Sequence, residues 1–302
     1  MRFSAKRSAA FPAPFECVHR RKVFTPIGLS MTRRPYTFQD IVAAYASLGL
    51  PRSGVVYVVS DIGLLMHYAE PGREAVLTAH LAALREVGGE DLTVVVPTAS
   101  MNLLGTDTVF SLSRTPAYRV GVFSEHVRRL PSARRSFHPF NSYAALGPQA
   151  SAIVDDVSRH GYGWGSPEAR MIDLDATVLS IGVEPRMSAS TTHHVEQVMT
   201  VPYRYVKEFR HPVERNGAVV EEYFYMYLMY RESDVQGLRN FGLKLFGDFT
   251  NRHPGAIRSA RLGKGQVHAY SMREYFRSAC ETIFRDPYAW CDRPPAIRPW
   301  QS

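Results

Sequence analysis

The run GVVYVV at residues 54–59 is almost continuously apolar and β-branched, which predicts a strand buried on both faces of a sheet. A second run of this kind, LTVVV at residues 92–96, ends at Pro97. Between the two runs, apolar residues recur at helical spacing from Ala75 to Val87, and Gly88-Gly89 ends this helix. Strand, helix and strand in this order predict a β-α-β unit, whose parallel strands belong to a sheet covered by helices.

The alternation of strand and helix continues along the rest of the chain. Further helices are predicted over about 37–49, 120–130, 149–159, 167–174, from 191, 235–246 and 272–284, and further strands over 136–146, 177–183 and 266–270. Two aromatic, β-rich stretches cover residues 203–209 and 218–230. Because no linker separates these pieces, we predict one α/β domain over residues 35–302. We expect a central sheet that is mixed but mostly parallel and flanked by helices, and a β-rich, irregular C-terminal third.

Composition and charge narrow the class of protein. The 302 residues are 45% hydrophobic and 12% aromatic, which is enough for a large buried core. The net charge is +8, but residues 1–34 hold eight Lys or Arg and one acid, which leaves 28 basic and 27 acidic residues for the rest. A nucleic-acid-binding domain needs basic side chains clustered on one face. We therefore expect no nucleic-acid partner.

The N-terminal 34 residues are Arg-rich and acid-poor, with no hydrophobic periodicity. We interpret them as a basic flexible leader, or as an upstream extension with translation starting at Met31, rather than as a transit peptide. No run of eighteen apolar residues exists, so we expect a soluble protein without a membrane partner. Cys17, Cys280 and Cys291 show no C-x-x-C spacing, which favours free thiols and the cytoplasm.

Polar side chains recur at the carboxyl ends of the predicted strands, where ligands bind in open α/β sheets. This arrangement favours a ligand cleft at that edge. The polar positions are Ser60 and Asp61 after the first strand, Thr98 after the second, His138 and Ser142 at the third, and residues 182–196 after the fourth. No G-x-S-x-G or G-x-G-x-x-G motif follows a strand, and the glycine-rich stretch 161–165 is more typical of an ordinary loop than of a phosphate cradle.

The segment STTHHVE, which begins at Ser190, is the strongest candidate for chemistry. Ser190 or Thr191 can cap a helix here, and a spacing of three places His193 and Glu196 on one helical face. Glu196 then either orients the imidazole or satisfies exposed backbone N–H groups in a capping box beside a surface histidine. Histidine, with an ordinary pKa of ~6.5, is the natural general base near neutrality. His194 points about 100° away on the helix, so the adjacent pair predicts no metal site.

An ordered series of motifs also carries a family resemblance. The series comprises Gly54–Ser60, Val94–Thr98, Thr115-Pro116, Gly121–Glu125, Arg135–Pro148, Gly165–Arg170, Asp175–Gly182, Thr191–Glu196, Val201–Arg204 and Arg285–Pro287. In this order the motifs resemble those of the aminoglycoside 3-N-acetyltransferase family, over about residues 37–290. The resemblance implies an α/β sandwich fold and direct transfer of an acyl group from acetyl-CoA to a substrate amine, without an acyl-enzyme or a metal.

The resemblance also implies roles for particular residues. It makes His193 the general base, Glu196 the carboxylate of the same motif, and Asp234 the downstream acid of the site. An amine that attacks a thioester sheds a proton as the C–N bond forms, and an imidazole can accept it. Five further positions fall on the segments expected to line the CoA and acceptor cleft: Ser60, Asp61, Thr98, His138 and Ser142. Backbone N–H groups near the first two are the expected donors to the developing oxyanion.

Two departures from the family pattern bear on the substrate. Resistance members of the family carry a histidine after the first strand, where this chain has Val59-Ser60-Asp61. The segment 204–215 is net basic and would repel a polycationic aminoglycoside. Both departures favour a neutral or acidic biosynthetic amine over a drug, and make an acyl-carrier-protein donor conceivable. The alternative is a catalytically silent relative that binds a ligand or partner. Either protein could be a monomer or a homodimer.

Overall fold

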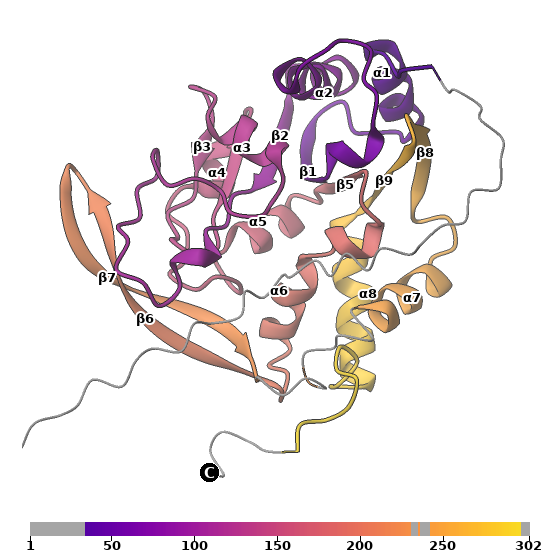
Figure 1. Cartoon of the computed structure of the whole chain (residues 1–302). Coiled ribbons are helices and arrows are strands. Elements are labelled where there is room, and N and C mark those ends of the chain that lie inside the picture. Colours follow the sequence, from indigo (N-terminus) through magenta and orange to yellow (C-terminus); the bar gives the residue numbers. More distant parts are fainter. Residues whose placement is uncertain (1–33, 231–234, 236–241, 297–302) are drawn as a thin grey trace, which may run out of the picture. The chain divides into compact units, whose positions relative to one another are not determined.

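A mixed sheet forms the centre of the fold (Figure 1). The computed structural model describes residues 34–230, 235 and 242–296, and within these residues the sheet has seven strands in the order β3-β4-β2-β1-β5-β9-β8. The strands are β1 Gly54–Ser60, β2 Leu92–Pro97, β3 Arg134–Arg135, β4 Tyr143–Leu146, β5 Thr177–Ile181, β8 Arg258–Leu262 and β9 Gly265–Ser271. β1 is parallel to β2 and β5, whereas β4 and β9 are each antiparallel to both of their neighbours. The other five strands therefore share one direction, and the predicted α/β fold with a mixed, mostly parallel sheet is confirmed.

The strand β1 is buried on both faces, as its apolar sequence predicts. Val55 and Tyr57 point into one core, and Val56 and Val58 point into the core on the opposite face. All four side chains are at most 2% exposed. This alternation is the ordinary consequence of the two-residue period of a strand, and it divides the domain into two layers of helices.

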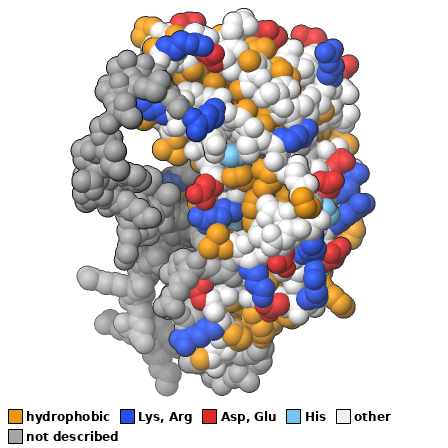
Figure 2. Space-filling view, turned by 90° about the vertical axis from the view of Figure 1, so that its right-hand side faces the viewer, with side chains coloured by type: hydrophobic (Ala, Val, Ile, Leu, Met, Phe, Trp, Pro, Cys, Tyr) orange, Lys and Arg blue, Asp and Glu red, His pale blue; other side chains and the backbone are white. Residues whose placement is uncertain are grey.

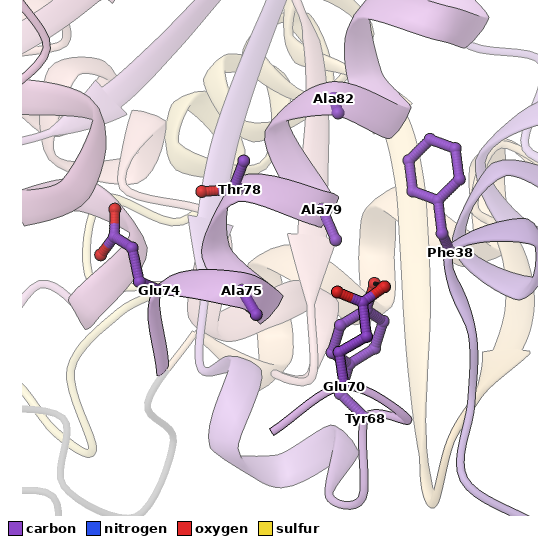
Figure 3. A pocket seen from close by; sticks show the side chains of 8 residues that line it. All are labelled: Phe38, Tyr68, Glu70, Glu74, Ala75, Thr78, Ala79 and Ala82. Atoms are coloured by element: carbon purple, nitrogen blue, oxygen red, sulfur yellow. Dashed lines mark hydrogen bonds between the residues drawn. The ribbon is translucent and has the colours of Figure 1, made fainter. Parts of the chain in front are cut away.

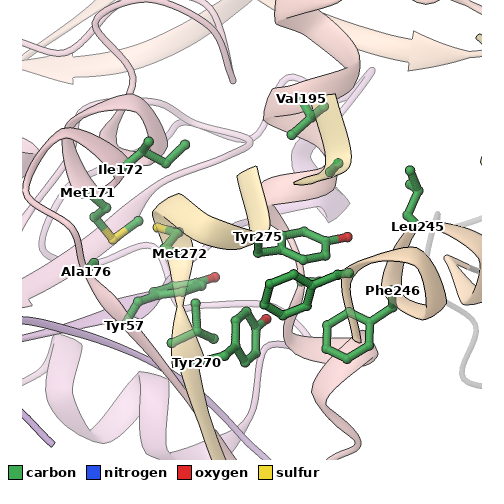
Figure 4. Close-up of a cluster of buried hydrophobic side chains, with 14 of the residues drawn as sticks. Tyr57, Met171, Ile172, Ala176, Val195, Leu245, Phe246, Tyr270, Met272 and Tyr275 are labelled. Carbon is green, nitrogen blue, oxygen red and sulfur yellow. The ribbon is translucent and has the colours of Figure 1, made fainter. Parts of the chain in front are cut away.

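Helices cover both faces of the sheet (Figure 1). A largely aliphatic core joins one face to α1 Phe38–Ser47, α2 Arg73–Gly88 and α3 Val122–Arg128. A core rich in Tyr and Phe joins the other face to α4 Ala150–Val154, α5 Pro167–Asp173, α6 Thr191–Val198, α7 Leu243–Arg252 and α8 Met272–Arg285 (Figure 4). Short 3₁₀ helices span Ile62–Leu65, Met101–Leu103 and Pro185–Ser188. The predicted helix start at Thr37 is confirmed, because Thr37 and Asp40 form a capping box.

A long hairpin leaves the sheet and packs on its own small core. Its strands β6, Arg204–Arg215, and β7, Ala218–Met229, pair in antiparallel register and are joined by Asn216-Gly217, both with positive φ. Asn-Gly is the sequence that such two-residue turns favour. The inner side of the hairpin, including Phe209 and Phe224, packs on Phe110 and Phe140. The expected β-rich C-terminal third is therefore this hairpin together with β8 and β9.

Several boundaries differ from the predictions. The expected strand at 136–146 is reduced to β4, because residues 136–142 form a loop whose backbone N–H groups, with that of Tyr143, donate to the side chains of Ser136 and His138. The helix expected over 235–246 is found as α7 at 243–252, and residues 236–241 lie outside the described part of the chain. β8 was not predicted. Residues from Arg34 onward form one compact unit, and the rest of the proposed leader also lies outside the described residues. None of the described helices is both long and apolar enough to cross a bilayer.

Candidate active site

Helix α6 brings together the two residues that the sequence singled out. The Nδ1 atom of His193 lies 2.8 Å from Oε2 of Glu196, one turn further along the helix. The Glu196 side chain is fully buried, whereas that of His193 is 16% exposed. Of the two interpretations left open by the spacing, the structure favours the first: Glu196 contacts the imidazole and does not cap the backbone of the helix.

The start of the hairpin supplies a cation to the same carboxylate. Nη2 of Arg204 lies 2.7 Å from Oε2 of Glu196, and the Tyr203 hydroxyl donates to Oε1 at 2.7 Å. Burial alone would raise the pKa of Glu196, but the Arg204 guanidinium and the bond from His193 outweigh it and hold this pKa below its usual range. Burial would likewise lower the pKa of Arg204, but Glu196 raises it. Glu196 is therefore a carboxylate and Arg204 a guanidinium.

Two groups meet Nδ1 of the His193 imidazole, and they differ in what they can do with its proton. Nδ1 of His193 lies 2.8 Å from Oε2 of Glu196 and 2.9 Å from Nη2 of Arg204, so it donates to the carboxylate when it carries the ring proton and accepts from the guanidinium when it does not. Because the guanidinium has no acceptor atom, the carboxylate is the only one of the two neighbours that can receive the Nδ1 proton. In a neutral imidazole with its proton on Nδ1, the lone pair lies on Nε2. The arrangement can thus present Nε2 as a proton acceptor.

Two aromatic rings flank the imidazole. The Tyr162 ring centroid lies 5.8 Å and the Trp290 centroid 5.5 Å from that of His193. Trp290 is 9% exposed, so the rings enclose the imidazole in a largely apolar setting. Such surroundings strengthen the interaction between His193 and the charge of Glu196, because water screens it less.

Ser60 and Asp61 lie at the end of β1 but do not join His193. The Ser60 side chain follows the register of Val56 and Val58 and approaches Gly121 at the start of α3, on the opposite face from α6. Its buried Oγ has no hydrogen-bond partner among the described residues. The backbone N–H of Asp61 donates to the Ile181 carbonyl at 2.8 Å. The expectation that this N–H serves an oxyanion is therefore corrected, because the sheet already uses it.

Thr98 and Ser142 do come together, but inside the protein. Both are fully buried, their hydroxyls lie 3.1 Å apart, and Ser142 also donates to the Thr98 carbonyl at 2.9 Å. Arg135 ties them to the neighbouring loop through bonds to Ser142 Oγ, the Thr98 carbonyl and the Thr115 carbonyl. These contacts fix the ends of β2 and β4, so their geometry indicates a structural role and offers no support for donor binding.

His138 shapes the loop that precedes β4. Its Nδ1 accepts from the backbone N–H groups of Phe140 and Asn141, and its Nε2 donates to the Arg159 carbonyl at 3.2 Å. It is 2% exposed, and burial lowers its pKa to about 3. A neutral imidazole with both nitrogens bonded to backbone is poorly placed to meet a ligand. His194 behaves similarly: it accepts from the Gly163 N–H, and burial lowers its pKa to about 4.

Asp234, the expected downstream acid of the site, lies outside the described residues.

The charge of residues 204–215 differs in the structure from what the segment alone indicates. This net basic segment was expected to repel a polycation, but acids on β7 and α6 pair with its arginines: Arg204 with Glu196, Arg210 with Glu221 and Arg215 with Glu222. The argument from its charge therefore fails. No three His, Cys, Asp or Glu side chains of the described residues lie close enough to hold a metal ion. The thiols of Cys280 and Cys291 are free.

Sequence reasoning missed four members of the site: Tyr203, Arg204, Tyr162 and Trp290. Arg204 had a usable signal, because a buried glutamate on α6 requires a cation and Arg204 begins the next strand. Tyr162 lies in the stretch 161–165, which was interpreted as an ordinary loop. Trp290 lies almost a hundred residues from His193 in the sequence, and no spacing rule connects such positions.

The described part of the chain also has a hollow away from His193, and one of its faces shows charges of both signs (Figure 2). A hollow of about 350 Å³ lies between α1 and α2, with Phe38, Tyr68, Glu70 and Glu74 around a floor of small residues from α2 (Figure 3). It contains none of the residues predicted for the site. On the face shown in Figure 2, Lys and Arg side chains are interspersed with Asp and Glu. This mixture agrees with the expectation that the folded part is nearly neutral.

Comparisons with known proteins were made on the sequence and on the fold. A family model described as aminoglycoside 3-N-acetyltransferase matches residues 67–283, more than two thirds of the chain. Aminoglycoside N(3)-acetyltransferase IV of Salmonella sp. is 34% identical over 167 residues, which are 54% of this chain and 60% of that relative. The matched part therefore spans less than two thirds of the relative's length.

Solved structures share the fold. A mutant of aminoglycoside acetyltransferase AAC(3)-IVa, in complex with a gentamicin, matches with a TM-score of 0.67 and 26% identity over 85% of this chain and 92% of that chain. AAC-IIIb, as a binary complex with CoASH, matches with a TM-score of 0.70 and 22% identity over 82% and 96%. At 22% identity, the second likeness shows the fold alone.

Proposed function

The chain belongs to the aminoglycoside 3-N-acetyltransferase family, and on this premise we propose that it transfers an acetyl group from acetyl-CoA to an amine of an aminoglycoside. The observation that carries the proposal is the triad of His193 and Arg204 around the buried carboxylate of Glu196, on α6 and β6. The matched relative is named for this activity, and the two structural neighbours hold a gentamicin and CoASH respectively.

The triad suits a direct transfer to a neutral amine. As the amine nitrogen bonds to the thioester carbon, Nε2 of His193 accepts the proton that the nitrogen sheds. The imidazolium that forms is stabilised by the carboxylate of Glu196, which Arg204 keeps ionised and fixed. The tetrahedral intermediate then expels the CoA thiolate, which takes the proton from the imidazolium and leaves as CoASH, so that His193 is neutral again. The products are the amide and free CoASH, and no acyl-enzyme is required.

We propose a cationic acceptor because the structure removes the objection that the charge of residues 204–215 raised against it. The sequence alone favoured a neutral or acidic acceptor, on the ground of the basic segment 204–215. In the structure its three arginines Arg204, Arg210 and Arg215 are paired with acids. The second departure remains: the family's histidine after β1 falls on Val59, whose side chain packs on the core that also holds Val195 of α6, so its loss concerns the same face of the sheet as the proposed base.

A thiol-release assay tests the function. Acetyl-CoA is incubated with a panel of aminoglycosides, and free CoASH is measured for the wild type, His193→Ala and His253→Ala. We expect turnover in the wild type, a loss of about 10² to 10⁴ in kcat for His193→Ala, and little change for His253→Ala, which removes an exposed histidine at the end of α7. An acetylated product identified by mass spectrometry confirms the acceptor.

The other outcomes separate the competing interpretations. CoA binding without turnover for any acceptor would indicate the silent relative. Turnover that requires an acyl-carrier-protein thioester in place of acetyl-CoA would change the donor, and turnover only with neutral amines would restore the biosynthetic acceptor. Full activity of His193→Ala would remove the imidazole from the mechanism.

A further inference from the structure

A second buried carboxylate lies at the start of α5, next to the helix that carries His193. Glu168 is 0% exposed. The hydroxyl of Tyr143 donates to its Oε1 at 2.7 Å, that of Ser190 to Oε1 at 2.9 Å, and that of Thr191 to Oε2 at 3.4 Å. Two of these three donors therefore come from the first residues of α6 and its N-cap. The triad of His193, Glu196 and Arg204 does not include Glu168.

The partners of Glu168 differ in kind from those of Glu196. Among the described residues, its hydrogen-bond donors are three neutral hydroxyls, with no Arg or Lys. Burial raises the pKa of Glu168, and the hydroxyls offset this only in part. The group is therefore adapted to hold hydroxyls in place rather than to balance a charge.

The start of α6 depends on this contact. Ser190 occupies the N-cap position, but its hydroxyl makes no capping bond to the helix. It contacts Glu168 instead, and the Tyr57 hydroxyl from β1 lies 3.0 Å from it. The Ser190 carbonyl in turn accepts the backbone N–H of His193 at 2.9 Å. A shift of Ser190 is thus passed to the backbone of His193 through one hydrogen bond.

We propose that Glu168 is a positioning residue, which fixes the first turn of α6 through Ser190 and Thr191 and thereby aims the His193 imidazole at the reacting amine. The inference rests on the proposed function of His193. Since Glu168 is fully buried, it contacts neither substrate directly. Its removal therefore misplaces the base rather than weakening substrate binding, and a displacement of about 1 Å at a catalytic group can cost about 10²-fold in rate.

Steady-state kinetics on matched variants tests this role. We expect Glu168→Leu to lower kcat by about 10- to 100-fold with both KM values nearly unchanged, and Glu168→Gln, whose amide can bond the same hydroxyls, to stay within about threefold of the wild type. Ser190→Ala removes a hydroxyl on the α6 side of Glu168 and should also lower kcat. Tyr143→Phe removes a hydroxyl from β4 instead, so it should lower the melting temperature but leave kcat within about threefold.

A second readout works without turnover, so failure of the inference can be told apart from failure of the proposed function. The ¹⁵N shifts of the His193 ring report which nitrogen carries the proton. We expect the Nδ1–H tautomer in the wild type and Glu168→Gln, and a mixture of tautomers in Glu168→Leu, because the ring moves from Glu196. Unchanged shifts and kcat in Glu168→Leu, or equal losses in Ser190→Ala and Tyr143→Phe, would overturn the positioning role. An inactive wild type with the expected shifts would overturn only the function.

Discussion

The two faces of the sheet bury their polar groups in different ways. Beneath α1 and α2, the His80 ring is fully buried beside the hydroxyls of Tyr36 and Tyr45, and burial lowers its pKa to about 3. The opposite face holds Glu168 and Glu196, the two carboxylates that are buried among the described residues. His80 meets the low dielectric by staying neutral, whereas Glu196 stays charged beside a guanidinium. Buried charge is costly and concentrates at functional sites, so the comparison points to the α5–α6 face as the site of chemistry.

The same comparison can be made within that face. Glu168 and Glu196 are equally buried, yet the pKa of Glu168 is raised by burial and that of Glu196 is lowered by Arg204 against the effect of burial. Burial therefore does not decide their ionisation; the charge of the partner does. This difference agrees with the proposed roles, in which Glu196 stabilises the imidazolium of His193 and Glu168 holds the start of α6.

The largest effect on stability is expected from removing the guanidinium of Arg204. Arg204→Met leaves the buried carboxylate of Glu196 without its guanidinium, and breaking one half of a buried ion pair costs about 3–5 kcal/mol of unfolding free energy. Urea unfolding measures this loss. Arg210→Met on the same strand breaks an exposed pair with Glu221 and should cost about 0–1 kcal/mol.

A double variant shows whether the cost arises from the unpaired charge. Glu196→Gln together with Arg204→Met removes both charges, so it should recover most of the stability that Arg204→Met loses. The double variant should remain inactive, because the carboxylate beside His193 is gone. A double variant no more stable than Arg204→Met would mean that packing of the arginine, rather than its charge, stabilises this face.

A smaller effect on stability is expected from a change of pH, and its sign should be opposite for Glu196 and Glu168. The lowered pKa of Glu196 contributes stability that is present above its unfolded value of about 4.3 and lost as pH falls through the folded value. The raised pKa of Glu168 contributes stability that is present below about 4.3 and lost as pH rises through its folded value. Relative to the wild type, Glu168→Gln should therefore gain stability as pH rises, whereas Glu196→Gln should gain stability as pH falls.

Melting temperatures between about pH 3 and pH 8 check these signs. Asp40→Asn serves as the reference, since Asp40 is a partly exposed carboxylate whose hydrogen bonds from Arg34 and Thr37 lower its pKa, so it follows the sign of Glu196 on the other face of the sheet. If Glu168→Gln and Glu196→Gln changed in the same direction with pH, the proposed difference between the two buried carboxylates would be wrong.

The local part of the fold could be predicted from the sequence. The strands at 54–59 and 92–96 were predicted because a continuous β-branched run is typical of a buried strand, and the helix predicted over 167–174 is found as α5. β8 was not predicted because its sequence, RSARL, has no alternation of apolar residues. It forms a strand because it pairs with the edge of β9. The loop at 136–142 was not predicted for a similar reason. His138 holds it partly through the Arg159 carbonyl, and this contact exists only once the chain has folded.

In the site, too, the local features could be predicted and those that depend on the fold could not. The spacing of three in one helix predicted the contact of His193 with Glu196, which is a local property. Ser190 was predicted as a cap, and it does occupy the N-cap, but Glu168 takes its hydroxyl because the fold brings α5 beside it. The polar ends of the strands were expected to converge on one cleft. Side chains at a strand end alternate between faces, however, and this alternation separates Ser60 from α6.

The smallest effect is expected on the face without buried charge. Tyr45→Phe deprives Nδ1 of His80 of a hydroxyl 2.5 Å away, which should cost about 0.5–1.5 kcal/mol, the ordinary worth of one neutral hydrogen bond. Because His80 is neutral and lies across the sheet from α6, kcat should be unchanged, in contrast to Ser190→Ala, which also removes one hydroxyl that contacts a buried titratable group. Urea unfolding and the thiol-release assay on the two variants measure the contrast. A fall in kcat for Tyr45→Phe comparable to that for Ser190→Ala would show that destabilising either face of the sheet slows the reaction. The α5–α6 face would then have no specific link to catalysis.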